Sequence, residues 1–244
     1  VGLDDRPPCK DELASMGRLL AAGLREGAFG LSSGLDYTPG SYATIEEMAF
    51  LVGVLRRRGG FYATHARERL GSSAAVLEAA LTSLLAGHPV HISHHKGGLW
   101  PGTGRQTMEI MADMARGRWP REGLGEFQLD PHLLRGRVRD LLEGRPGPSL
   151  AVNVTYDMYP YTASRTWLKS YLPGWVISGG EEAMLERLEA GSVRKRLREE
   201  MARAQNGWED LVVAGSTRGS VQRWRGRSLR EIAQRESVDP FEAL

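Results

Sequence analysis

The 244 residues, 41% hydrophobic and 25% charged, are enough to bury a substantial core and fit one large domain. No apolar run reaches the roughly 18 residues of a bilayer span, and no signal-peptide pattern opens the chain, so membrane and secreted classes gain no support. The net charge of +2 is too small to indicate a nucleic-acid partner. A single cysteine, Cys9, excludes an internal disulfide and favours a reducing, cytoplasmic compartment.

The first 161 residues alternate between helix-like and strand-like patterns. Asp11–Arg25 has apolar residues at helical spacing, and a short apolar run follows it in "EGAFGLSSGLDY". Thr44 and Glu47 form a capping box ahead of a second helix that stops at the glycines of "RRRGG". The same alternation continues with a strand "FYATH", a helix from Ser73, a strand "VHIS", a helix over Gln106–Arg116 and a strand in "LAVNVTYDMYPY".

This alternation predicts βα units and a parallel sheet, which is either doubly wound or closed as a barrel. Four strand candidates are half of the eight that a closed (β/α)8 TIM-like barrel needs. We expect residues 1–168 to form this partial barrel, with an insertion at 117–149. Because the chain opens on Val1 and stops within an apolar pattern, we expect it to be a central fragment of a longer protein.

Beyond residue 168 the pattern becomes mainly helical and highly charged, so 169–244 is expected to form a helical covering region. Five arginines between Arg218 and Arg230 are expected to form a solvated surface. The elements predicted in this region are helices over Glu181–Glu189, Val193–Ala204 and Ser228–Arg235, and a brief strand at "LVVAG".

Two successive strand candidates lead directly to a histidine. His65 closes "FYATH", and His94 follows "VHIS". The carboxyl ends of neighbouring parallel strands meet at one edge of a sheet, where barrel enzymes place their active sites. Neutral imidazole is the commonest metal ligand, so the pair predicts a shared metal ion. A structural hydrogen-bonding role is the alternative for either histidine alone.

Other side chains near these strand ends are weaker candidates. His91 alternates with His94 across the strand, so only one of the two is expected to be a ligand, and His94 lies nearer the end. His95 is then a turn residue or a residue that supports a ligand. Lys96 could bind an anionic substrate group, with an ordinary surface lysine as the alternative.

Phenolic and carboxylate groups also follow the strand candidates. Tyr37 and Tyr159 offer hydroxyl donors to the same edge, although a tyrosine that packs at a strand end is common. Asp36 and Asp157 could orient a histidine or a substrate, but their spacing does not single them out.

Four strings in order, "EGAFGLSSGLDYTPGSYAT", "GGFYATHARE", "VHISHHKG" and "DMYPYTAS", resemble the D-aminoacylases, or N-acyl-D-amino-acid deacylases, of the metal-dependent amidohydrolase superfamily. The resemblance implies a distorted (β/α)8 barrel that binds zinc and hydrolyses the amide bond of an N-acyl-D-amino acid. It implies zinc ligation by His65 and His94. Lys96, Tyr37 and Tyr159 would hold the substrate carboxylate.

The resemblance is incomplete. The family's H-x-H pair, its cysteine ligand and its catalytic aspartate are not identifiable here, and Cys9 lies in a loop that enters a helix. The catalytic base is therefore expected outside this chain, and the chain alone is expected to be inactive. The alternatives are a cyclic amidase of the hydantoinase or dihydroorotase kind, and a non-catalytic remnant.

Overall fold

The computed structural model describes residues 1–67, 72–95, 103–120, 122–124, 127, 137–142, 150–201, 207–216 and 219–243. The chain divides into two compact units, Val1–Pro160 and Tyr161–Leu244. The sequence placed the change of pattern at residue 168, a few residues later. Among the described residues, no helix is both long and apolar enough to cross a bilayer.

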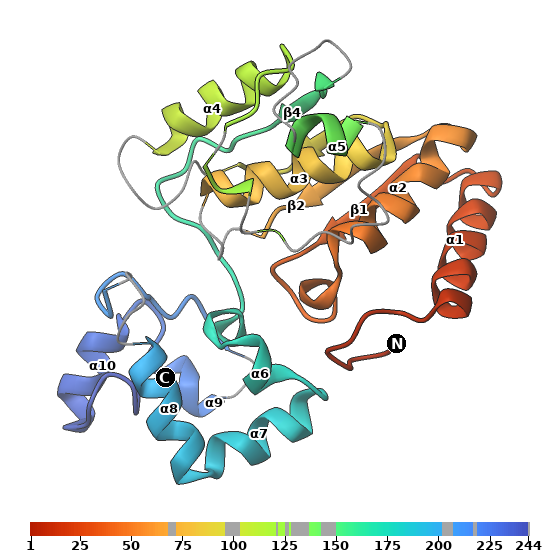
Figure 1. Cartoon of the computed structure of the whole chain (residues 1–244). Coiled ribbons are helices and arrows are strands. Elements are labelled where there is room, and N and C mark those ends of the chain that lie inside the picture. The colour runs from red at the N-terminus through yellow and green to blue at the C-terminus, as the bar shows by residue number, and fades with distance from the viewer. Residues whose placement is uncertain are drawn as a thin grey trace. The chain divides into compact units, whose positions relative to one another are not determined.

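The first unit is an α/β fold built on a parallel four-stranded sheet (Figure 1). The strands are β1 (Gly30–Gly34), β2 (Phe61–His65), β3 (Val90–Ile92) and β4 (Val154–Tyr156). They lie in the sheet in chain order, and each neighbouring pair runs parallel. Parallel neighbours need a long crossover connection, which the alternating helices provide. The predicted parallel α/β architecture is therefore confirmed.

Helices connect the strands of this unit and pack side by side. They are α1 (Lys10–Arg25), the 3-10 turn η1 (Gly40–Tyr42), α2 (Ile45–Arg58), α3 (Ser72–Ala86), α4 (Thr103–Met114) and α5 (Arg137–Leu142). Helix α1 packs on α2, α2 on α3 and α3 on α4. Most of the expected insertion at 117–149 lies outside the described residues, but its helix α5 buries Val138 and Leu141 in the core of the unit.

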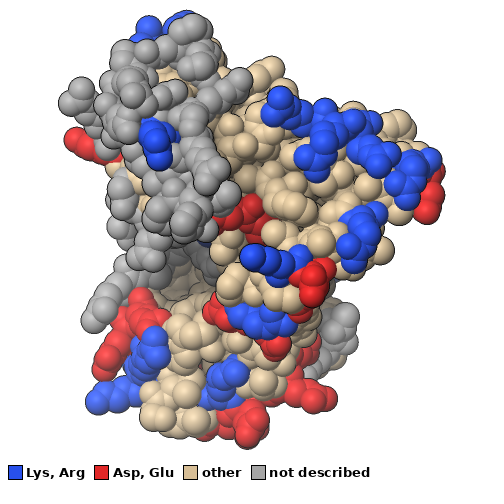
Figure 2. All heavy atoms as spheres, turned by 45° about the vertical axis from the view of Figure 1, so that its right-hand side comes forward, with Lys and Arg blue, Asp and Glu red and all other residues tan. Residues whose placement is uncertain are grey.

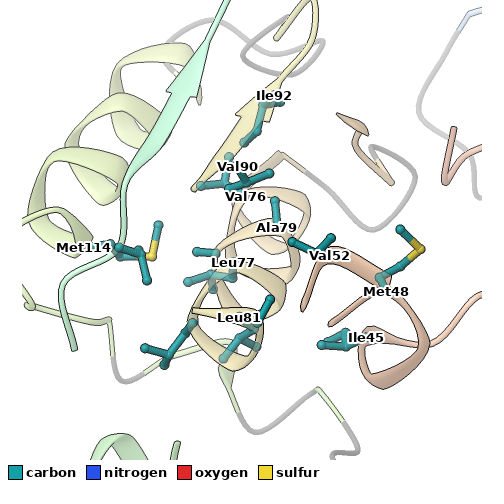
Figure 3. Close-up of a cluster of buried hydrophobic side chains, with 14 of the residues drawn as sticks. Ile45, Met48, Val52, Val76, Leu77, Ala79, Leu81, Val90, Ile92 and Met114 are labelled. Carbon is teal, nitrogen blue, oxygen red and sulfur yellow. The ribbon is translucent and has the colours of Figure 1, made fainter. Parts of the chain in front are cut away.

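Helix α3 lies at the centre of the core because its sequence is apolar on every side. Val76 and Leu81 are fully buried, and Val90 and Ile92 of β3 face the same cluster (Figure 3). On β2, Tyr62 and Thr64 are buried in alternation with the less covered Ala63 and His65. Because successive side chains of a strand point to opposite faces, the less covered face, which includes His65, can contribute side chains to a site at the strand ends.

Local sequence sets the limits of α2. The Thr44 hydroxyl accepts the Glu47 N–H at 3.2 Å, so the predicted N-terminal cap is present. Gly59 ends the helix with φ of 86°, a conformation that favours glycine. Arginines fill its last turn, where they complement the helix dipole.

Figure 2 shows both signs of charge on the face that it draws, with a run of Lys and Arg along one margin.

The second unit is helical. Its elements are the 3-10 turn η5 (Leu168–Tyr171) and the helices α6 (Gly174–Ile177), α7 (Glu181–Glu189), α8 (Gly191–Met201), α9 (Gly219–Gln222) and α10 (Leu229–Glu236). Its buried core is small: Leu172, Val176, Ile177, Met184, Leu197 and Phe241.

The three helices predicted in this region are confirmed as α7, α8 and α10, but the predicted strand at "LVVAG" is wrong. Val212 makes only an isolated antiparallel bridge to Ser228. Val212 is 56% exposed, and the pairing does not extend beyond this single bridge. The described arginines of Arg218–Arg230 are exposed or half-buried, as expected.

Candidate metal centre

Two predicted histidines meet at the carboxyl edge of the sheet. His65 is the last residue of β2, and His94 lies two residues past β3. Thr64 and Ile92 are partners in the parallel register, and the Ser93 N–H continues the ladder to the Thr64 carbonyl at 2.9 Å. Both side chains therefore start from the same edge.

The two imidazole rings are in direct contact. Nδ1 of His65 lies 3.0 Å from Nε2 of His94, and the ring centroids are 4.5 Å apart. Two nitrogen ligands of one tetrahedral zinc ion lie about 3.3 Å apart, since each Zn–N bond is near 2.0–2.1 Å. The observed separation suits a pair of ligands to one ion. It suits equally a hydrogen bond between the rings when one nitrogen carries the proton.

Asp36 lies beside His65. Its Oδ2 lies 3.5 Å from Nε2 of His65, and both side chains are largely buried, at 19% and 14% exposed. A carboxylate beside Nε2 favours the tautomer with the proton on Nε2, which leaves the Nδ1 lone pair facing His94. Metal-binding histidines commonly have such a carboxylate partner. The sequence offered Asp36 only as one of two unselected candidates.

The Asp157 carboxylate binds the backbone N–H of His94. Its Oδ1 accepts the His94 N–H at 2.5 Å, and its Oδ2 lies 2.8 Å from Nε2 of His91. The hydrogen bond from His91 and that from the His94 amide lower the pKa of the Asp157 carboxyl. His91 is thus engaged with Asp157 and does not join the pair of His65 and His94.

Each of the two predicted tyrosines has its ring near one of the two histidines. The Tyr37 ring centroid lies 4.7 Å from that of His65, and the Tyr159 centroid lies 6.5 Å from that of His94. Tyr37 sits in a turn closed by its N–H to the Gly34 carbonyl at 3.2 Å. The structure therefore brings four of the five predicted site residues together.

A buried arginine anchors the loop that carries Asp36 and Tyr37. Arg67 lies two residues beyond His65, and its Nε is 3.2 Å from the Glu78 carboxylate of α3. Its two terminal nitrogens donate to the carbonyls of Ser41 and Ala43, the latter at 2.8 Å. The Arg67 and Glu78 side chains are 9% and 7% exposed, so this pair is shielded from water.

The remaining candidates fall elsewhere. Lys96, the predicted anion-binding residue, lies outside the described residues. His95 is buried and its Nε2 lies 2.7 Å from the Thr107 hydroxyl of α4, so it ties the turn after β3 to that helix. Within the described part of the chain, no group of three or more His, Cys, Asp or Glu side chains is placed to hold a metal ion. The two histidines by themselves do not make a complete metal site in this part of the chain.

A parallel α/β sheet with imidazoles at its carboxyl edge is typical of α/β enzymes. No family model matches the chain. The sequence is 36% identical to a D-aminoacylase of Alcaligenes xylosoxydans xylosoxydans over 115 residues, which cover 46% of this chain and 24% of that protein. It is 29% identical to an N-acyl-D-glutamate deacylase of the same organism over 162 residues, 66% of this chain and 27% of that protein.

Solved structures lead to the same group of proteins. The N-acyl-D-glutamate deacylase of Bordetella bronchiseptica, crystallised with zinc and a phosphonate mimic of the tetrahedral intermediate, matches 98% of this chain and 37% of its own. The TM-score is 0.61 and the identity is 25%. The homologues of this chain are thus D-aminoacylases and N-acyl-D-amino-acid deacylases, hydrolases of the amidohydrolase type, and the predicted resemblance is confirmed. The chain spans about a quarter of the length of the curated relatives it matches.

Proposed function

We propose that this chain supplies two zinc ligands and part of the substrate pocket of a hydrolase that cleaves N-acyl-D-amino acids into a carboxylate and a free D-amino acid. The contact between the His65 and His94 rings, at 3.0 Å, is the observation that carries the proposal. The likeness to an N-acyl-D-glutamate deacylase crystallised with zinc supports the choice of metal, and the homology to a D-aminoacylase supports the choice of reaction. The four-stranded sheet would then be part of a (β/α)8 barrel.

In this proposal Nδ1 of His65 and Nε2 of His94 face the metal, and Asp36 keeps the proton of His65 on its other nitrogen. Zinc, when bound, would act as a Lewis acid toward the amide carbonyl and make hydroxide available near neutral pH. No group of three or more His, Cys, Asp or Glu among the described residues is placed to hold a metal ion, so the further ligands would come from elsewhere. The general base would lie outside this chain, as the family resemblance implies.

The tyrosines and Lys96 would hold the substrate's α-carboxylate. The Tyr37 ring lies near His65 and the Tyr159 ring lies near His94, so each histidine has one tyrosine as a neighbour. Lys96, close to His94 in sequence, would add a positive charge to this carboxylate site. Fixing the carboxylate and the acyl carbonyl at two points leaves one direction for the side chain, which is how a site selects the D configuration.

The test is a zinc and substrate assay on the whole protein. We expect bound zinc and hydrolysis of N-acetyl-D-amino acids in preference to their L isomers. His65→Ala and His94→Ala should each lose zinc and activity. His88→Ala is the matched control, since His88 contacts the carbonyls of Pro89 and Gly60, away from the pair. Zinc-free protein would contradict the proposal and favour a non-catalytic remnant, and hydantoin turnover without open-chain amide hydrolysis would indicate a cyclic amidase.

A further inference from the structure

The residue that follows β4 is fixed in place by its own backbone. The Asp157 N–H donates to the Ile92 carbonyl at 3.2 Å, and the Asp157 carbonyl accepts the His95 N–H at 2.8 Å. These bonds continue the parallel ladder between β3 and β4 past the strand ends. The Asp157 side chain therefore starts from a defined position beside the turn that carries His94.

The carboxylate of Asp157 joins two parts of that turn. One oxygen accepts the His94 N–H at 2.5 Å, and the other lies 2.8 Å from Nε2 of His91. Nδ1 of His91 lies 2.9 Å from the hydroxyl of Thr155, its register partner on β4. A carboxylate only accepts, so His91 donates from Nε2, and the neutral ring can accept the Thr155 hydroxyl at Nδ1. The carboxylate is thus held by a chain of hydrogen bonds along one face of the sheet.

The backbone of His94 needs such support. Its φ is 41°, in the left-handed region that residues with a Cβ seldom adopt. In this conformation its ring reaches His65, with 3.0 Å between the facing nitrogens. In the same conformation the His94 N–H donates to the Asp157 carboxylate. An unusual backbone conformation at a ligand position is a sign of a functional constraint.

We infer that Asp157, locked by His91, is a positioning residue that holds the His94 main chain so that its imidazole faces the metal position beside His65. The inference rests on the proposed zinc site and assigns Asp157 no contact with substrate. The carboxylate acts through the His94 amide. Removing it lets the turn relax toward negative φ, which rotates the ring away from His65.

The experiment measures zinc affinity of the whole protein by competition with a chromophoric chelator. Asp157→Ala should weaken zinc binding about 10- to 100-fold, the usual effect of removing a group that orients a ligand. Asp157→Asn should restore most of this loss, because its amide oxygen can still accept the His94 N–H. Asp113→Ala is the matched control, since the Asp113 side chain is 49% exposed and pairs with Arg118. This variant should bind zinc as the wild type does.

A second measurement reads the contact itself. Hydrogen exchange of the His94 amide in zinc-free protein should accelerate in Asp157→Ala and stay unchanged in Asp113→Ala. Zinc affinity of Asp157→Ala equal to that of the wild type overturns the inference. If Asp157→Ala does not fold, His91→Ala should give a smaller loss in the same direction, and wild-type affinity there overturns it. A wild-type protein that binds no zinc defeats the proposed function itself, which is a different result.

Discussion

The two compact units are stabilised in different ways. The first, Val1–Pro160, buries a large apolar core around α3 and also buries polar side chains, among them Arg67 and Glu78. The second, Tyr161–Leu244, has a small core and many exposed ion pairs. Arginines also cover its aromatic rings, with the Arg196 guanidinium 4.0 Å from the centroid of Trp175.

The two units also differ in how many polar side chains they bury and in where these side chains lie. Among the described residues, every buried polar or charged side chain except Ser228 belongs to the first unit. Several of them, including Thr64, Arg67 and His95, lie at or just beyond the carboxyl ends of β2 and β3. Burying a polar group is costly unless it is fully hydrogen-bonded, so such groups are expected where loops must hold a fixed position. The first unit therefore has the features of a site scaffold.

The largest expected effect comes from breaking the buried ion pair of the first unit. Arg67→Met removes the positive charge beside the buried Glu78 carboxylate and the donors to two loop carbonyls. We expect the free energy of unfolding to fall by about 3–5 kcal/mol, measured by urea denaturation. The double variant Arg67→Met with Glu78→Leu should recover much of the loss. If Arg67→Met is as stable as the wild type, the claim that the first unit depends on its buried ion pair is wrong.

A smaller effect is expected at Ser228, the one buried polar side chain among the described residues of the second unit. The Ser228 hydroxyl accepts the Glu231 N–H at 3.1 Å and its own N–H donates to the Glu231 carboxylate at 2.8 Å, a capping box for α10. Ser228→Ala should destabilise this unit by about 1 kcal/mol in thermal or urea unfolding. Ser220→Ala, at an exposed position of α9, is the control and should change little.

The smallest effect is expected for the exposed ion pairs of the second unit. Glu242 pairs with Arg194 and Arg198, whose side chains are 37% and 47% exposed. Glu242→Gln should cost about 0–1 kcal/mol, and the difference from wild type should vanish at 1 M salt because such pairs are screened. The Arg67 variant should keep its defect at the same salt concentration. An equal salt dependence in both variants would contradict the comparison.

Sequence patterns predicted the local elements well because they depend on nearby residues. Helical periodicity placed α1, and the pair Thr44 and Glu47 marked the start of α2. The strand "LVVAG" was predicted wrongly: its composition is β-like, but in the structure Val212 forms only an isolated bridge and is 56% exposed. The sequence also predicted correctly that His65 and His94 lie close together, because two adjacent parallel strands end at one edge of the sheet.

The sequence by itself determined the alternation of helix and strand, the parallel sheet and the approach of His65 to His94, because hydrophobic period and parallel connection leave few other arrangements. Only the tertiary structure decided which polar side chains lie beside the two histidines and hold the loops around them. Asp36, Arg67 and Asp157 are ordinary charged residues in the sequence, and each gains its role from a partner 11 to 66 residues away or from a loop that packs beside it. A hydrogen bond forms only when donor and acceptor lie within a range of a few tenths of an ångström. The sequence pattern does not give positions at that precision, because they depend on how the whole chain packs.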